Sequence, residues 1–226
     1  MTTGKLIVID GIDGSGKGTQ TRMLQEHLTK EGYDVVSVDF PQYGSKSAGP
    51  IEEYLNGKYG KLDPYRASIL YAVDRHDASY KLREWLDAGK IIISNRYVTA
   101  NAGHQGGNIS DPGERDKYFT WLNNLEYEIF GIPKPDLNII IHVPAETAQK
   151  LVDKKNSEQR VYNEGKKGDI LEADIEHLKH AEKIFLEIAE KFPNMVLLES
   201  VDENGKMLSP ESVHNKLWDI VLKEIK

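Results

Sequence analysis

The chain of 226 residues contains no cysteine, so it has no disulfide and no thiol chemistry. It also has no apolar run of transmembrane length and no basic segment followed by an apolar leader at its N-terminus. Basic residues are fewer than acidic ones: the chain has 29 Lys and Arg and 36 Asp and Glu, which gives a net charge of −7. That deficit argues against nonspecific binding to nucleic acid or to an anionic membrane. These absences favour a soluble cytoplasmic protein with a small ligand.

No Pro/Ser-rich linker and no change of composition divides the chain, so we expect a single domain over residues 1–226. Short β-rich runs alternate with helical patterns. The runs Ile91-Ile92-Ile93 and Ile139-Ile140-Ile141 are apolar without alternation, which is typical of a parallel sheet covered on both faces. The expected class is α/β, a three-layer fold with a five-stranded parallel sheet flanked by helices. The expected strands are Lys5–Asp10, Asp34–Asp39, Ile91–Asn95, Leu137–Val143 and Met195–Glu199.

Helices are expected wherever apolar residues recur three or four residues apart between a start and a stop signal. One such helix carries Tyr118, Leu122, Leu125 and Ile129, and it ends near Phe130 because Gly131 breaks it. The expected helices are Lys17–Lys30, Ile51–Leu55, Pro64–Leu86, the segment ending near Phe130, a segment starting at Pro144-Ala145, about Ile170–Phe192, and Ser209-Pro210 to Ile225.

The stretch after the first strand has the pattern of a phosphate-binding loop. Its small residues allow successive N–H groups to surround an anion, the next helix adds its positive N-terminal end, and Lys17 can reach the β- and γ-phosphates. A nucleoside triphosphate is the implied ligand, and the fold is expected to be that of a P-loop NTPase. Gly18 stands where a magnesium-binding hydroxyl is expected, and the hydroxyl of Thr19 follows one residue later. The residues expected to bind ATP are Gly11, Ile12, Asp13, Gly14, Ser15, Gly16, Lys17, Gly18 and Thr19.

The carboxyl ends of parallel strands meet at one edge of a sheet, so the segments that follow the strands are expected to form one cleft. Arg96 ends the third strand, where a guanidinium can hold a phosphate through two hydrogen bonds or make an ordinary salt bridge. Asn101 and Gln105 are four residues apart, so on a helix they would share one face and could offer amide donor–acceptor pairs to the edge of a base.

Tyr71 and Arg75 are also one helical turn apart, in the middle of a long expected helix. An aromatic ring beside a guanidinium suits a planar base. The alternatives for Asp74-Arg75 are a solvated patch and an internal salt bridge.

Two basic stretches, Lys154–Arg160 and Lys166–Gly168, form a polar connection that is either a solvated loop or a mobile lid. A lid would bring cations to a triphosphate on closure, and Arg160 suits that role because a guanidinium bridges phosphate oxygens. Further along, His177 and His180 are three residues apart, with no other metal-ligating cluster near them. We expect both histidines to be solvated.

Four segments together resemble the thymidylate kinase family: Ile9-Asp10-Gly11-Ile12-Asp13-Gly14-Ser15-Gly16-Lys17, Phe40-Pro41, Tyr71-Ala72-Val73-Asp74-Arg75 and Asn95-Arg96-Tyr97. The resemblance runs in order along most of the chain. It implies transfer of the γ-phosphate of ATP to dTMP with Mg²⁺, in a homodimer.

Carried onto this sequence, the resemblance implies a role for each matching residue. Lys17 and the loop would hold ATP, Arg96 would grip the monophosphate, and the lid would supply Arg160 for catalysis. The acceptor would be bound by Asp13 at its 3′-hydroxyl, by Tyr71, Arg75 and Asn101 at its base, and also by Phe40, His104, Gln105 and, from the lid, Tyr162. The metal contact would be Thr19, directly or through water.

Three positions depart from the family pattern. Asn95 stands where an aspartate is usual, Gln42-Tyr43 stands where an arginine is common, and Gly18 displaces the hydroxyl. These departures leave three alternatives: a kinase for another deoxynucleoside monophosphate, a deoxynucleoside kinase, and a nucleotide-binding regulator without catalysis. Lys17 and the cations of the expected lid favour an enzyme over the regulator.

Overall fold

Five parallel strands form the central layer of the protein. The computed structural model describes residues 4–160 and 175–226, leaving out the side chains of residues 154–160. Three expected strands match the structure to the residue, and the other two differ by one residue at one end. The strand order is β2-β3-β1-β4-β5, and every neighbouring pair is parallel. The strands are β1 Lys5–Asp10, β2 Val35–Asp39, β3 Ile91–Asn95, β4 Leu137–His142 and β5 Met195–Glu199.

Helices account for most of the remaining described residues. None of the helices in this part of the chain is both long and apolar enough to cross a membrane. The helices are α1 Lys17–Lys30, α2 Gly49–Leu55, α3 Pro64–Asp87, α4 Val98–Gly106, α5 Pro112–Asn123, the π-helix η1 Asn124–Ile129, α6 Ala145–Arg160, α7 Ile175–Lys191 and α8 Pro210–Ile225.

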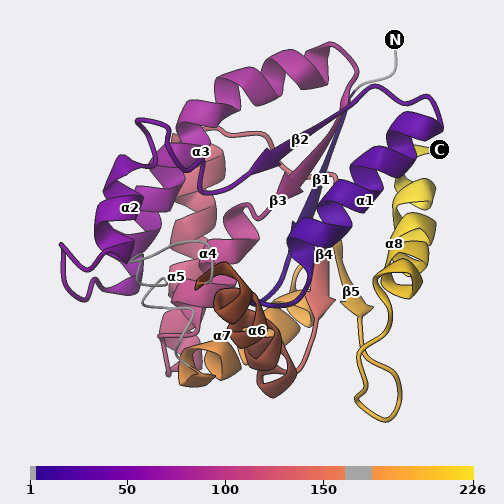
Figure 1. Ribbon diagram of the computed structural model, residues 1–226. Coiled ribbons are helices and arrows are strands. Elements are labelled where there is room, and N and C mark those ends of the chain that lie inside the picture. Colours follow the sequence, from indigo (N-terminus) through magenta and orange to yellow (C-terminus); the bar gives the residue numbers. More distant parts are fainter. Residues whose placement is uncertain (1–3, 161–174) are drawn as a thin grey trace.

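The helices cover both faces of the sheet, as the unbroken apolar strands predict (Figure 1). Successive side chains of a strand point to opposite faces, so each central strand contributes to two apolar cores. Ile7 and Ile9 of β1 pack with residues of α1 and α8. Leu6 and Val8 belong to the other core, which includes residues of α3, α4, α5 and α7. The three-layer α/β prediction is confirmed.

The predicted connection at Lys154–Arg160 is helical instead, since α6 continues to Arg160. This stretch contains neither glycine nor proline, and Lys, Glu, Gln and Arg are good helix formers, so nothing in the sequence ends the helix earlier. Residues 161–174, which include the rest of the expected lid and the expected first turn of α7, lie outside the described residues.

The helix predicted to end near Phe130 changes its winding after Asn123. The N–H of Phe130 donates to the carbonyl of Leu125, five residues earlier, at 2.9 Å. A π-turn holds more residues than an α-turn, so side chains beyond it are rotated from their expected faces. Ile129, one of the apolar residues of the expected helix, is 66% exposed, whereas Glu126 is fully buried. The regular apolar spacing therefore does not mark the buried face at this end of the helix.

His142, at the carboxyl end of β4, joins three further elements. Its Nδ1 lies 2.7 Å from a carboxylate oxygen of Glu199 at the end of β5, and its Nε2 lies 2.9 Å from Glu182 of α7. The other oxygen of Glu182 accepts from the N–H of Ala145, the first residue of α6. Burial alone would lower the pKa of His142, but the hydrogen bonds to Glu182 and Glu199 outweigh burial and raise that pKa.

A pKa raised in the folded state makes the His142 contribution depend on pH. The stabilisation is fully present below the pKa of an unfolded histidine, about 6.5, and is lost as the pH rises through the higher folded pKa. We expect His142→Gln to lower the free energy of unfolding by about 1–2 kcal/mol at pH near 6 and by less at pH near 9. Urea unfolding of both proteins at the two pH values measures this, and equal losses would contradict it.

Candidate active site

The loop between β1 and α1 has a backbone that requires glycine. Gly11, Gly14 and Gly16 have φ angles of 137°, 83° and 90°. A Cβ on Gly11 would lie 2.5 Å from the carbonyl oxygen of Ile141, and one on Gly14 would lie 2.4 Å from that of Ala148. Only glycine fits both the turn and these close approaches, so the chain curls at the N-terminus of α1 as the motif predicts.

The side chain of Lys17 is folded back over this loop and is only 6% exposed. Its Nζ donates to the carbonyl oxygens of Gly11 at 3.0 Å and Ile12 at 2.8 Å, and lies 3.8 Å from the Asp13 carboxylate. Lys17 also lines the cleft above the loop. Its ammonium is thus held where it can meet an anion seated on the loop.

A single cleft of about 920 Å³ runs from the phosphate-binding loop to the far end of the site. Asp13 to Thr19 line it, whereas Gly11 and Ile12 are buried beneath the loop and do not. A Cβ on Gly18 would meet no atom of the described residues within 4 Å, so packing in this part of the chain does not require a glycine there. Every predicted acceptor residue in the described part lines the same cleft: Asp13, Phe40, Tyr71, Arg75, Arg96, Asn101, His104 and Gln105.

The cleft also reaches residues that the sequence analysis did not single out. One group of them comes from the segment after β5 and the start of α8, and the sequence has no motif there. The group consists of Ser200, Met207, Leu208, Pro210 and Val213.

Arg96 lies between the two ends of the cleft and has a backbone unusual for its residue type. Its φ of 68° is in the left-handed region, which costs a non-glycine residue energy. The N–H of Arg96 donates to the carbonyl of Ile9 at 2.9 Å, and the Ser94 hydroxyl donates to the carbonyl of Arg96 at 2.6 Å. Neighbouring strands therefore hold the strained residue in place.

The Arg96 guanidinium contacts two side chains from different elements. Its NH2 donates to Asp13 of the loop, and its NH1 lies 3.1 Å from Nε2 of His104 on α4. Burial alone would raise the pKa of Asp13, but Arg96 and then Lys17 outweigh it and hold that pKa well below its ordinary range. The neighbouring Asp10 is fully buried, and burial raises its pKa to about 6 despite the same two cations. Two cations and one ionised carboxylate thus face the centre of the cleft.

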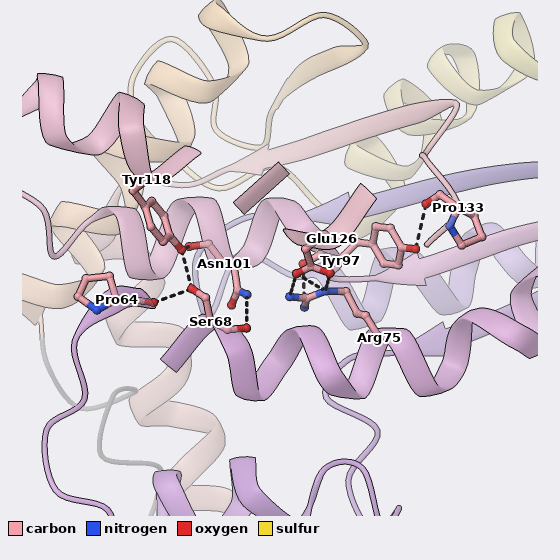
Figure 2. A network of polar contacts seen from close by, with 8 residues as sticks. All are labelled: Pro64, Ser68, Arg75, Tyr97, Asn101, Tyr118, Glu126 and Pro133. Carbon is pink, nitrogen blue, oxygen red and sulfur yellow. Dashed lines mark hydrogen bonds and ion pairs between the residues drawn. The ribbon is translucent and has the colours of Figure 1, made fainter. Parts of the chain in front are cut away.

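Arg75 makes a buried salt bridge with Glu126, the residue turned inward by the π-helix (Figure 2). Its Nε lies 3.0 Å from both carboxylate oxygens, and its NH1 donates to the carbonyl of Tyr97 at 3.3 Å. Of the three interpretations of Asp74-Arg75, the salt bridge is confirmed, and Arg75 also lines the cleft. Sequence reasoning missed Glu126, because its predicted helix placed apolar residues on the inner face.

Asn101, which lines the cleft, is fixed by a polar network (Figure 2). Its Nδ2 donates to the carbonyl of Ser68 at 3.1 Å, and its own carbonyl accepts from the Tyr118 hydroxyl at 3.0 Å. The hydroxyls of Ser68 and Tyr118 are 2.7 Å apart, and the Ser68 hydroxyl also donates to the carbonyl of Pro64. One N–H of Nδ2 is used by Ser68, so Asn101 has its Oδ1 acceptor and a second N–H donor for a ligand.

The predicted solvation of the two α7 histidines is half right. His180 is exposed, but His177 is only 7% exposed and lines the cleft. Its Nε2 lies 3.4 Å from Nδ1 of His104. His177 precedes the buried Ala181 by four residues and Ile184 by seven, so the helical spacing held a signal for its burial.

The loop after β2 carries one of the departures from the family pattern. The backbone N–H of Gln42 donates to Asp74 of α3 at 2.8 Å, and the Gln42 side-chain Nε2 donates to the same carboxylate at 3.1 Å. Gln42 therefore ties the loop to α3 and is turned toward Asp74. Two predicted residues remain untested, since the side chain of Arg160 and all of Tyr162 lie outside the described residues.

The P-loop, the parallel sheet and the two-ended cleft define a phosphotransferase of the nucleoside monophosphate kinase type. The thymidylate kinase family model matches residues 9–209, and the chain belongs to that family. It is 30% identical to the thymidylate kinase of Caldanaerobacter subterraneus subsp. tengcongensis over 226 residues, 99% of each chain. It is 29% identical to that of Mycobacterium tuberculosis over 187 residues, 81% of this chain and 85% of the relative. A solved thymidylate kinase from Candida albicans matches with a TM-score of 0.72 and 25% identity, over 98% of this chain and 92% of that one.

Proposed function

We propose that this protein transfers the γ-phosphate of ATP to dTMP, giving dTDP and ADP for dTTP synthesis. The observation that supports this most is the shared cleft, because one cavity is lined by the phosphate-binding loop and by the planar and amide side chains of α3 and α4. Arg96 lies between these ends. Membership of the thymidylate kinase family supports the same reaction.

The hydrogen-bonding groups at the far end of the cleft are proposed to bind thymine. Asn101 offers an acceptor, and Arg75 has only donors. Thymine presents a ring N–H donor beside a carbonyl acceptor, which this pair can match, and membership of the thymidylate kinase family supports thymine as the base. Tyr71, half-buried and lining the cleft, is proposed to stack on the base, with Phe40 and Gln105 completing the pocket.

The acceptor is already a phosphate anion, so the reaction needs alignment and neutralisation of charge more than a strong base. Lys17 is proposed to contact the donor phosphates and Arg96 the acceptor phosphate. Asp13, kept ionised by these cations, can accept from the sugar 3′-hydroxyl. From the expected lid, Arg160 is proposed to stabilise the transferring group and Tyr162 to cover the acceptor.

Mg²⁺ is proposed as the cofactor. The described residues contain no cluster of three or more ligating side chains, which fits a metal held largely by phosphate oxygens and water. Asn95 and Thr19 line the cleft with oxygen atoms, and the buried Oδ1 of Asn95 has no hydrogen-bond partner among the described residues. These hard oxygen groups suit Mg²⁺, which would neutralise phosphate charge when bound.

We also propose a homodimer formed through α3. Ile69, Val73 and Tyr80 are 41%, 43% and 63% exposed, and spacings of four and seven residues put them on one face of the helix. A second copy of the chain is the proposed occupant, since the family resemblance implies a homodimer. Sedimentation equilibrium of wild type and Val73→Asp tests this: a dimeric wild type and a monomeric variant support it.

An acceptor panel tests the proposed substrate. With ATP and Mg²⁺, we expect kcat/KM for dTMP to exceed that for dCMP by at least about 100-fold, because the wrong base leaves buried polar groups unpaired. Chelation of the metal should abolish turnover of dTMP. The Candida albicans relative is described as having broad substrate specificity, so dUMP and dGMP belong in the panel.

Each alternative function gives a different pattern in that panel. A second monophosphate turned over faster than dTMP would identify a different nucleotide kinase. Thymidine turned over faster than dTMP would identify a deoxynucleoside kinase. No turnover of any acceptor, with ATP still bound, would identify a regulator.

A further inference from the structure

The contact between Arg96 and His104 fixes the protonation of the imidazole. A guanidinium has donors and no acceptor, so the 3.1 Å contact from NH1 to Nε2 exists as a hydrogen bond only if Nε2 accepts. Nε2 then carries no proton, and His104 is the neutral tautomer with its proton on Nδ1. Burial and the charge of Arg96 both lower the pKa of His104, consistent with a neutral ring.

The N–H at Nδ1 of His104 is directed at a second histidine, His177. Nδ1 of His104 lies 3.4 Å from Nε2 of His177, the rings are tilted by 18°, and both side chains are buried. Since His104 donates here, the Nε2 of His177 accepts and is also unprotonated. A directional series of hydrogen bonds therefore runs from Arg96, the residue after β3, through His104 of α4 to His177 of α7.

We propose that His104 and His177 are positioning residues, which hold the Arg96 guanidinium toward the acceptor phosphate through this series of hydrogen bonds. The inference rests on the proposed function, in which Arg96 grips that phosphate. His177 fixes the tautomer of His104, and only this tautomer can accept from Arg96. The opposite tautomer would direct an N–H at the guanidinium.

The charges around Arg96 explain why neutral partners suit this task. Asp13 from the loop already supplies one carboxylate, the buried Asp10 lies below it, and Lys17 adds a cation from α1. A second carboxylate in place of His104 would cancel the charge of Arg96 and compete with the phosphate. A neutral imidazole orients the guanidinium and leaves its charge available to the substrate.

A packing role makes a different prediction. His104 also meets the ring of Phe185 edge-on, with centroids 5.5 Å apart, so the two imidazoles could act only as flat fillers between α4 and α7. If His177 only fills space, a phenyl ring at position 177 would fill it equally well. It cannot accept the proton of His104, whereas the side-chain oxygen of glutamine can.

The test uses three variants of the full-length protein. In His177→Phe, we expect KM for dTMP to rise about three- to tenfold, with kcat and KM for ATP within about twofold of wild type, as for loss of one buried hydrogen bond. In His177→Gln, KM for dTMP should return most of the way to the wild-type value. His180→Phe, on the exposed face of the same helix, is the matched control and should leave all three constants unchanged. Equal KM values in the Phe and Gln variants would overturn the proposal.

A second measurement does not depend on turnover. Nitrogen chemical shifts of the His104 ring in the wild-type protein, assigned by comparison with His104→Gln, distinguish the two neutral tautomers and the charged form. We expect the proton on Nδ1. A proton on Nε2, or on both nitrogens at neutral pH, would overturn the proposal whether or not dTMP is the acceptor, so its failure is distinct from failure of the proposed function.

Discussion

Replacing Lys17 with alanine is expected to lower kcat for phosphoryl transfer by about 10³-fold, the scale of losing one preorganised contact to developing charge. The ammonium of Lys17 is nearly buried and already lies over the loop carbonyls, so it costs little to reorganise when phosphate arrives. Alanine leaves the charge of the transferring group without this partner. The measurement is the initial rate of dTDP formation at saturating ATP and dTMP.

The matched control for this prediction is Lys30→Ala, which removes an exposed lysine from the other end of α1 and should keep wild-type kcat. Circular dichroism and thermal unfolding establish that both variants are folded. A folded Lys17→Ala protein with kcat within about tenfold of wild type would show that Lys17 does not act on the transferring phosphate.

Replacing Glu126 with alanine is expected to cost about 3–5 kcal/mol of the free energy of unfolding, because it leaves the charge of Arg75 buried without a partner. Arg75 is 1% exposed and Glu126 is fully buried. Burial alone would lower the pKa of Arg75, but Glu126 outweighs burial and raises it, so the guanidinium is charged in the folded protein. Urea unfolding monitored by fluorescence measures the loss.

The double variant Arg75→Met/Glu126→Leu separates charge from packing. Removing both partners leaves no buried charge, so its loss should be clearly smaller than that of Glu126→Ala. A double variant destabilised as much as the single one would mean that the volume of Glu126, and not its charge, stabilises this part of the protein.

The elements that depend on local signals could be predicted from the sequence. Strand positions followed from short apolar runs, and the start of α1 followed from the loop motif. The residues at the ends of the strands were expected to meet because parallel strands end at the same edge, and Arg96 and Asp13 do meet.

Predictions failed where winding or long-range packing decides the outcome. A regular helix would have buried Ile129, but the π-turn exposes it, and the buried partner of Arg75 is Glu126. No local sequence pattern predicts the π-turn. His177 was expected to be solvated because it was considered as a metal ligand and not for its place on the apolar face of α7.

Arg96 illustrates the limit for a single site residue. Its position at the end of a strand indicated a phosphate ligand, and the family resemblance agreed. The sequence does not show that Arg96 has a left-handed backbone. It also does not show that the guanidinium meets a carboxylate from the loop and an imidazole from α4, because these segments are far apart in the chain. Such an arrangement needs the tertiary structure.

The most direct test of the central claim follows the phosphate itself. ATP labelled in its γ-phosphate is incubated with the purified protein, Mg²⁺ and dTMP, and the products are separated. The account predicts that the label appears in dTDP at the rate of ADP formation, and that Lys17→Ala slows both by about 10³-fold. Label released only as free phosphate, or no label in dTDP while ATP is bound, would contradict it.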